Sequence, residues 1–370
     1  MKMTIDKAGF LRPLTHIYGV VERRNTLPIL SNLMIEAKDS QVRLIATDMD
    51  MDIVEVAEAN VEQTGEMTTL AHTLCDIVRK LPDGSEITIE TTNQGKKVTI
   101  STGRMLFTLP TLPPEDFPKI SSEKMAVQFK IGAAELRSMV HTTKDSTSQE
   151  ESRYYLMGIY LHKTDDGLLR AVATDGHRLA LTEMPLPDGA SNIPAAIIPR
   201  KTYDELLRLM ENYSDEVEIG LTENRIRFSL GTVVMTSRLI DGNFPDYERV
   251  VPRDNQLKAV VSTIAFREAV DRVSTVSSEK SRTVELLFGK EGLTISAHGQ
   301  DQASGTEVIA TTWSGSEDLK IGFNSRYLLD IANLMKGDDM EFAFAEPSNP
   351  SLIRPTDDDA SLFVVMPVRV

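Results

Sequence analysis

Asp175 and His177 are the one pair of side chains in this sequence whose types and spacing suggest acid–base chemistry. They lie in the segment 173–179, which follows a strand-like run at 168–172. Asp175 and Gly176 predict a turn there, because glycine tolerates positive φ and an aspartate side chain bonds its own backbone. An Asp-x-His pair in a turn more often stabilises its loop than catalyses a reaction, and the sequence places no nucleophile beside it. A hydrolase that uses this pair is therefore the weaker of two hypotheses.

Other motifs for catalysis or cofactor binding are missing from the sequence. There is no Gly-x-Gly-x-x-Gly, Walker, Gly-x-Ser-x-Gly, His-Glu-x-x-His or Cys-x-x-Cys motif. The six histidines include no pair at the spacing that a helix needs to hold a metal. Enzyme signatures are thus mostly absent, and we expect no cofactor and no metal.

The residues around the turn fit a docking cleft better than an active site. Apolar side chains that could line it come from three parts of the chain: Leu156, Leu179, Val364, Met366 and Val368. Arg178, Arg249 and Arg369 could hold polar or acidic groups at its rim. Such a set suits a helix in a groove or an extended peptide. The alternative is an ordinary sheet core, which is weaker because the sequence ends at Val370 and a terminus frays unless it is tied down.

Size and composition are those of a globular chain with more than one domain. The 370 residues are 41% hydrophobic and 26% charged, enough for two or three domains with cores of their own. A single cysteine, Cys75, excludes a disulfide framework and fits the reducing cytoplasm. No apolar run is long enough to cross a membrane, and the first residues lack the apolar core of a secretory signal.

The net charge of −15 excludes a simple basic protein that coats nucleic acid. The charge is unevenly distributed, however: the segments expected to be helical are mildly basic, and the acidic excess lies in strands and loops. If the helices share one surface, that surface could accept a polyanion. The alternative is that lysine and arginine are enriched there only because they favour helices.

A repeat of about 125 residues organises the chain. Thr47 and Thr174 are 127 positions apart, and so are Pro118 and Pro245, which end similar segments. Each of three copies has two amphipathic helices with apolar residues at spacings of three and four. The first helices are expected at 5–18, 131–143 and 261–276, and the second ones at 70–81, 199–210 and 324–335.

Short alternating runs between the helices predict strands. The first pairs are expected at 29–37 and 41–47, 155–162 and 168–174, and 283–288 and 293–297. Further strands are expected at 86–90, 97–102, 105–109, 216–219, 225–230, 233–239 and 360–367. This order indicates an α+β fold of three tandem domains, at 1–121, 127–250 and 251–370, with largely antiparallel sheets. Open sheet edges favour edge-to-edge joining between domains and between chains.

Six stretches together carry a resemblance to a known family: 26–30, 153–156, 173–179, 198–201, 241–247 and 364–369. Over essentially its whole length the sequence resembles the bacterial sliding clamps, the beta subunits of DNA polymerase III. The resemblance implies a head-to-tail homodimeric ring of six clamp-type domains, with twelve helices around the hole and sheets at the rim. It also implies a non-catalytic processivity factor that encircles duplex DNA and tethers the polymerase, in the cytoplasm at the nucleoid.

The resemblance assigns roles to individual residues. A cleft for partner peptides would use Leu156, Thr174, Gly176, His177, Arg178, Leu179, Pro245, Arg249, Val250, Val364, Met366, Pro367, Val368 and Arg369. DNA contacts would come from Arg24, Gln149, Tyr154, Tyr155 and Lys201, and the dimer interface would include Phe107, Leu109 and Val276. The implied partners are a second copy of the chain, double-stranded DNA, the polymerase III catalytic subunit, the clamp loader, and other polymerases and repair proteins with a clamp-binding peptide.

Three positions depart from the family pattern. His72 stands where the family has a basic residue, and Val368 and Val370 are smaller than the family residues expected there. These departures bear on DNA contact and on peptide preference. The first copy of the repeat also has Met49 and Asp50 where the second has Gly176 and His177. Only the middle domain should therefore carry a docking site, giving one per chain and two per ring.

Overall fold

The computed structural model describes residues 1–22, 26–120, 123–277 and 282–369 of the chain. It forms two compact units. The first unit contains residues 1–136, 187–194 and 201–239, and the second contains 137–186, 195–200 and 240–370. The positions of Arg24 and Val370 lie outside the described residues.

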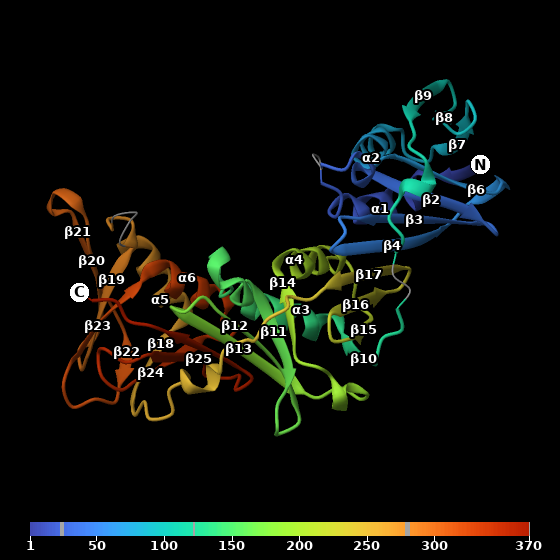
Figure 1. Ribbon diagram of the computed structural model, residues 1–370. Helices are drawn as coiled ribbons and strands as arrows, with labels where there is room; N and C mark the ends of the chain where they lie inside the picture. Colours follow the sequence, from blue (N-terminus) through green and yellow to red (C-terminus); the bar gives the residue numbers. More distant parts are fainter. Residues whose placement is uncertain (23–25, 121–122, 278–281, 370) are drawn as a thin grey trace. The chain divides into compact units, whose positions relative to one another are not determined.

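Six α-helices occur in the described residues, and all six expected helices are confirmed (Figure 1). They are α1 (Lys7–Tyr18), α2 (Ala71–Lys80), α3 (Ala133–Lys144), α4 (Arg200–Leu209), α5 (Thr263–Ser274) and α6 (Ser325–Leu334). Side-chain caps explain several starts: Asp6 accepts the N–H of Gly9, and Ser262 accepts that of Ala265. These contacts satisfy N–H groups that the first turn of a helix leaves unpaired.

The first unit holds a five-stranded and an eight-stranded sheet (Figure 1). The smaller one has the order β5 (Asn60–Gln63), β1 (Lys2–Asp6), β7 (Glu86–Thr92), β8 (Lys97–Thr102) and β9 (Met105–Pro110). The larger one has the order β10 (Val127–Gly132), β15 (Glu216–Leu221), β16 (Arg225–Leu230), β17 (Val233–Arg238), β4 (Met51–Glu58), β3 (Gln41–Thr47), β2 (Asn32–Lys38) and β6 (Gly65–Leu70). Strand β17 pairs with β4, so one sheet joins the first copy of the repeat to the second.

The second unit holds a nine-stranded and a four-stranded sheet. The larger one has the order β14 (Ala196–Pro199), β11 (Gly158–Lys163), β12 (Leu168–Thr174), β13 (Arg178–Pro185), β26 (Ser361–Val365), β25 (Ser351–Pro355), β24 (Asp339–Phe344), β18 (Leu257–Ser262) and β22 (Thr311–Trp313). The smaller one has the order β21 (Ser304–Ile309), β20 (Gly292–His298), β19 (Thr283–Gly289) and β23 (Leu319–Asn324). Here β13 pairs with β26, which repeats the edge-to-edge joining between the second copy and the third.

Apolar faces of helices and sheets meet in the core of each unit. In the second unit, Phe266 of α5 packs edge-on against Phe342 of β24, with ring centroids 5.2 Å apart. Phe288 packs against both Phe342 and Phe344 in the same core. In the first unit, Phe10, Leu14 and Ile17 of α1 are fully buried. Burial of such side chains stabilises a fold by about 1.5–3 kcal/mol each, so the predicted amphipathic faces are the ones that hold the units together.

Two expected strands begin later than the sequence suggested. Residues 28–31 form a 3-10 helix, η1 (Pro28–Ser31), and residues 151–156 form another, η3 (Glu151–Leu156). Pro28 has no N–H to give to a strand, and its fixed φ suits the start of a 3-10 turn. Strand β11 starts at Gly158, where a Cβ would lie 2.5 Å from the carbonyl oxygen of Ile198. The equivalent placement of both 3-10 helices before a strand is a further sign of the repeat.

Candidate functional site

The turn at 173–179 is built by its own side chains. Asp175 Oδ1 accepts the backbone N–H groups of His177 at 2.8 Å and Arg178 at 3.0 Å. Thr174 Oγ1 accepts the N–H of Gly176 and donates to the carbonyl of Arg178. Gly176 has φ +88°, the left-handed conformation that favours glycine. Because Asp175 bonds the backbone of His177, the pair stabilises a turn, and the hydrolase hypothesis loses the observation on which it rested.

The same turn occurs in the first unit, one repeat earlier. Asp48 Oδ1 accepts the N–H groups of Asp50 at 3.0 Å and Met51 at 2.7 Å, and Thr47 accepts that of Met49. Met49 has φ +82°, a conformation that is uncommon for a residue with a side chain. The repeat seen in the sequence is therefore reproduced at the level of individual hydrogen bonds.

The residues after the two turns differ in polarity. In the second unit Leu179 pairs with Val364 across β13 and β26, and both are buried in a cluster with Val172 and Tyr247. In the first unit the corresponding pair is Asp52 with Thr236, both buried and polar. Burial raises the pKa of the Asp52 carboxyl. An apolar cluster thus lies beside the second turn, and polar groups take its place beside the first.

The last described residues are fixed beside the turn of the second unit. The N–H of Met366 donates to the carbonyl of His177, and that of Val368 donates to the carbonyl of Gly322 in β23, each at 2.9 Å. Met366 and Val368 still expose 40% and 37% of their surface. The expectation that the end of the chain is tied down is confirmed as far as Val368, and apolar side chains stay exposed next to the predicted cleft.

A segment at 244–250 carries three further predicted cleft residues, Pro245, Arg249 and Val250, which are all exposed. Its anchors are aromatic: Phe244 stacks on Tyr160 with ring centroids 4.6 Å apart, and Tyr247 is buried. Neither aromatic anchor is among the residues predicted for the cleft. Their spacing around Pro245 is the signal that could have revealed them, because large rings on a short loop usually pack against a neighbouring surface.

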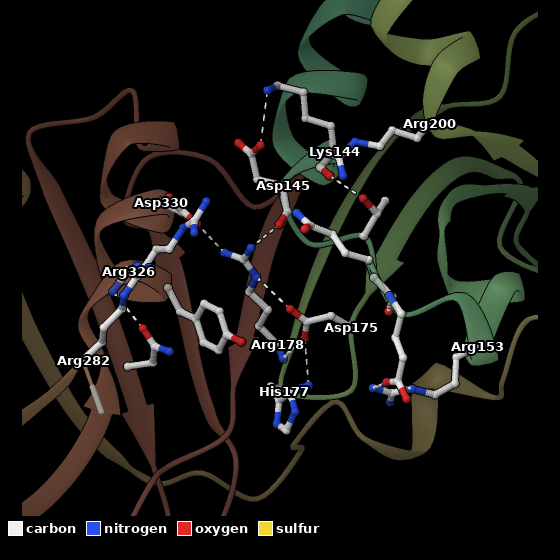
Figure 2. Close-up of a pocket in the computed structure, with 16 residues that line it drawn as sticks. Lys144, Asp145, Arg153, Asp175, His177, Arg178, Arg200, Arg282, Arg326 and Asp330 are labelled. Atoms are coloured by element: carbon white, nitrogen blue, oxygen red, sulfur yellow. Dashed lines mark hydrogen bonds and ion pairs between the residues drawn. The ribbon is translucent and has the colours of Figure 1, made fainter. Parts of the chain in front are cut away.

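A polar pocket of about 580 Å³ lies beside the turn (Figure 2). Its lining includes the predicted residues Gln149, His177 and Arg178 together with Arg153 and Asp330. Arg153 forms an ion pair with Glu150, and its Nη1 lies 2.6 Å from the position that a Cβ on Gly176 would occupy. Any side chain at position 176 would therefore displace Arg153. This close approach is a second reason, besides the positive φ angle, why the position requires glycine.

Arg178 is placed differently from the predicted free rim residue. Its side chain is only 10% exposed. The guanidinium contacts Asp175 at 3.2 Å and Asp330 of α6 at 2.6 Å, and it also donates to the carbonyl of Asp145. Tyr327 lies beneath it, with the guanidinium carbon 4.4 Å from the ring centroid. Sequence reasoning found neither Asp330 nor Tyr327 as part of this site.

The predicted DNA contacts occupy contrasting environments. Gln149 and Tyr154 are exposed on one short segment, where Tyr154 packs edge-on against Tyr155. Lys201 is already paired, with its ammonium 2.5 Å from Asp48 and 3.3 Å from Glu22. Burial opposes the charged form, yet the bonds to these two carboxylates raise the pKa of Lys201.

The side chain of His72 makes its contacts within its own unit. Its Nε2 lies 2.7 Å from the carbonyl oxygen of Val21, and its ring packs edge-on against Tyr18. Its other ring nitrogen, Nδ1, is buried and has no hydrogen-bond partner among the described residues. Both ring nitrogens of His72 therefore face the protein, and neither is placed to donate a hydrogen bond to a DNA phosphate.

The three predicted interface residues are covered to different extents. Phe107 and Val276 are half-buried, and Leu109 is buried. Among the described residues, the large apolar side chains with the highest exposure are Leu106 of β9 at 67% and Val308 of β21 at 60%. Strands β9 and β21 each form one edge of a sheet. Leu106 could not be predicted as an interface residue, because the sequence pattern of β9 does not show which face of the strand is buried within its own unit.

The described residues contain no cluster of three or more His, Cys, Asp or Glu side chains arranged to hold a metal ion. Among the helices that the structure describes, none is long and apolar enough to span a membrane.

Comparison with known proteins agrees with this architecture. Three profiles of the DNA polymerase III beta subunit match in order: the N-terminal domain at residues 1–121, the central domain at 130–246 and the C-terminal domain at 248–369. The chain is 43% identical to the beta sliding clamp of Caulobacter vibrioides, with 100% of both chains covered. The crystal structure of a sliding clamp, DNA polymerase III subunit beta, from Bartonella birtlesii bound to griselimycin has a TM-score of 0.96 at 45% identity, again with full coverage of both chains.

Three tandem α+β domains joined through shared antiparallel sheets define a clamp-type protein. The chain belongs to the DNA polymerase III beta subunit family. This family supplies the sliding clamp, a processivity factor that works with DNA and DNA polymerase III and has no catalytic activity of its own. The resemblance inferred from the sequence is confirmed.

Proposed function

We propose that two copies of this chain form a closed ring around duplex DNA and tether the replicative polymerase to it. The observation that carries this proposal is the full-length match of three consecutive clamp domains. A tether raises the effective concentration of the polymerase at the primer end, so the enzyme rebinds instead of diffusing away. The chain would act in the cytoplasm at the nucleoid, with domain boundaries at 121–127 and 250–251.

Two sheet edges are suited to close the ring. Strand β9 ends the five-stranded sheet and exposes Leu106, while β21 ends the four-stranded sheet and exposes Val308. An edge strand presents unpaired N–H and C=O groups that a second strand can bond. Pairing β9 of one copy with β21 of the other is a head-to-tail contact, and two such contacts would close a dimer. Phe107, Leu109 and Val276 would support the contact from the adjoining surface.

DNA would be held loosely, by groups that do not read sequence. Gln149, Tyr154 and Tyr155 offer polar atoms on an exposed segment, and Arg24 would add a charge. Lys201 would contribute less than a free lysine, because it is already paired with Asp48. Contacts to the phosphate backbone have no preferred register, so they permit sliding.

The apolar floor and the exposed residues around it would form one peptide cleft per chain. It would comprise Leu156, Thr174, Gly176, His177, Arg178, Leu179, Pro245, Arg249, Val250, Val364, Met366, Pro367, Val368 and Arg369. The buried Leu179 and Val364 supply the floor, and the exposed Val250 and Met366 supply adaptable walls. The occupants would be the polymerase III catalytic subunit, the clamp loader, and other polymerases and repair proteins with a clamp-binding peptide.

Primer extension on a long single-stranded circle tests this function. With the polymerase and the clamp loader from the same organism, adding the chain should lengthen the products made in a single binding event. The gain should require the loader and ATP. Products of unchanged length at saturating amounts of the chain would contradict the proposal.

A further inference from the structure

We propose that Asp330 is a positioning residue for the partner cleft: through Arg178 it fixes the turn at 174–179, and it thereby couples occupation of the cleft to helix α6. The inference rests on the cleft proposed above. Asp330 belongs to α6 and is absent from the predicted cleft residues. Its effect would be exerted through Arg178 and not by contact with the partner.

Arg178 connects the turn to two other elements. Its Nε contacts Asp175 Oδ2 at 3.2 Å within the turn, and its Nη1 contacts Asp330 Oδ2 at 2.6 Å on α6. Its Nη2 donates to the carbonyl of Asp145, just after α3. Figure 2 shows the guanidinium between Asp175 and Asp330. The guanidinium carbon also lies over the ring of Tyr327. A planar guanidinium holds several acceptors in fixed directions, so these contacts define its position.

Asp175 passes this position on to the turn. One of its carboxylate oxygens holds the guanidinium, and the other accepts the backbone N–H groups of His177 and Arg178. The carbonyl of His177 in turn accepts the N–H of Met366. Hydrogen bonds and the backbone of His177 therefore connect Asp330, through Arg178 and Asp175, to Met366 beside the cleft floor.

Charge and burial indicate that the position of Arg178 depends on its contact with Asp330. The side chains of Arg178, Asp175 and Asp330 are 10%, 16% and 27% exposed. A guanidinium that is this well covered needs its carboxylate partners, because breaking a buried ion pair leaves an uncompensated charge. If Asp330 loses its charge, Arg178 must be held by Asp175 and Asp145 alone. The turn then samples more than one position, and the partner must select the competent one.

The first unit supplies a matched control. There Arg208 of α4 is held by Glu205 and donates to the carbonyls of Thr15 and His16 near the end of α1. This arginine likewise joins an acid on the second helix of one repeat to carbonyls near the end of a first helix. It does not contact the turn at 47–52, where Met51 replaces Arg178 and Asp48 bonds Lys201 instead. The contact in the first unit is thus chemically similar but remote from a cleft.

The experiment compares Asp330→Asn, Asp330→Glu and Glu205→Gln in the full chain. The probe is the DNA polymerase III catalytic subunit from the same organism, immobilised for surface plasmon resonance, and thermal unfolding is measured alongside. We expect Asp330→Asn to weaken binding roughly tenfold, the scale of one charge-assisted hydrogen bond. Asp330→Glu keeps the carboxylate and should restore most of the affinity. Glu205→Gln should bind as the unchanged chain does.

A second measurement follows hydrogen exchange in helix α6, first in the unchanged chain and then in Asp330→Asn. If cleft and helix are coupled, linkage requires that binding of the polymerase subunit slows amide hydrogen exchange in residues 325–334. The same helix in Asp330→Asn should respond less. Asp330 as a purely structural residue would lower the melting temperature without this response to the partner.

The outcomes separate the inference from the cleft on which it rests. Unchanged affinity in Asp330→Asn, an equal loss in Glu205→Gln, or exchange in α6 that ignores the partner would each overturn the coupling. Met366→Ala is the separate test of the cleft, because Met366 is exposed and distant from Asp330 in the network. Full affinity in Met366→Ala would remove the proposed cleft itself, and the coupling with it.

Discussion

The ring nitrogen Nε2 of His162 lies 2.9 Å from the hydroxyl oxygen of Tyr247, the buried anchor of the 244–250 segment. The other ring nitrogen, Nδ1, faces the carbonyl oxygen of Lys163 at 2.9 Å and must donate to it. Nε2 of the neutral ring is then an acceptor for the Tyr247 hydroxyl, which itself accepts from Arg170 Nη1. One wall of the proposed cleft therefore depends on an uncharged histidine.

This relationship predicts a dependence on pH. Burial lowers the pKa of His162, with Arg170 acting in the same direction and Glu248 and the Lys163 carbonyl opposing it. The neutral ring thus stabilises the fold above the ordinary histidine pKa of about 6.5, and this contribution is lost as the pH falls through that value towards the lowered one. The melting temperature of the natural chain should decline more between pH 7.5 and pH 5.5 than that of His162→Gln. Parallel declines would contradict this assignment.

The end of the chain should be required for partners and dispensable for folding. Deleting residues 366–370 removes Met366 and Val368 from the cleft and leaves strand β26 whole. Binding of the polymerase catalytic subunit should fall below detection, while dimer mass and the unfolding transition stay close to those of the full chain. Retained affinity would show that the cleft lies elsewhere.

Leu106 should contribute to the dimer more than Leu27 does. Its side chain is 67% exposed in one chain, and burying a leucine is worth about 1.5–3 kcal/mol. Leu106→Ala should therefore raise the dimer dissociation constant about 10- to 100-fold in sedimentation equilibrium. Leu27→Ala, at an exposed leucine outside the edge strand, is the control and should leave the dimer unchanged. Equal effects of both variants would argue against β9 as the interface.

Arg24 and Lys201 should differ in their effect on salt dependence. A lysine or arginine that neutralises one phosphate contributes about one to the slope of log affinity against log salt. We expect Arg24→Ala to lower that slope by about one, and Lys201→Ala to lower it by less, because Asp48 and Glu22 already hold its ammonium. Titrations of labelled duplex DNA over a range of salt concentrations measure both. An equal drop for the two variants would mean that DNA displaces the carboxylates.

Local chemistry made the helices and the turn predictable. Apolar spacing defined α1 to α6 to within about two residues. Asp175 and Gly176 defined the turn, because their preferences act within four residues. The joining of domains by sheet edges followed from the same strand patterns and is confirmed by the pairing of β17 with β4 and of β13 with β26.

Side-chain partners that are far apart in the chain could not be predicted from the sequence. Arg178 and Asp330 are 152 positions apart, and nothing local distinguishes a rim arginine from one buried between two carboxylates. The sequence likewise does not show that Lys201 is paired, whereas in the structure its ammonium forms an ion pair with Asp48. Leu106 and Leu109 are equally apolar, and only their placement on β9 decides that Leu109 is covered and Leu106 is not. Such distinctions require the packed structure, because they depend on what lies opposite each side chain.

Retention on circular DNA tests the central claim most directly. The chain is loaded by the clamp loader onto a nicked circular plasmid and separated from free protein by gel filtration, before and after the plasmid is cut once. A ring held by topology should remain on the circle and slide off the linear form, with a large difference in half-life at moderate salt. Equal loss from both forms, or a chain that stays monomeric at micromolar concentration, would contradict the account.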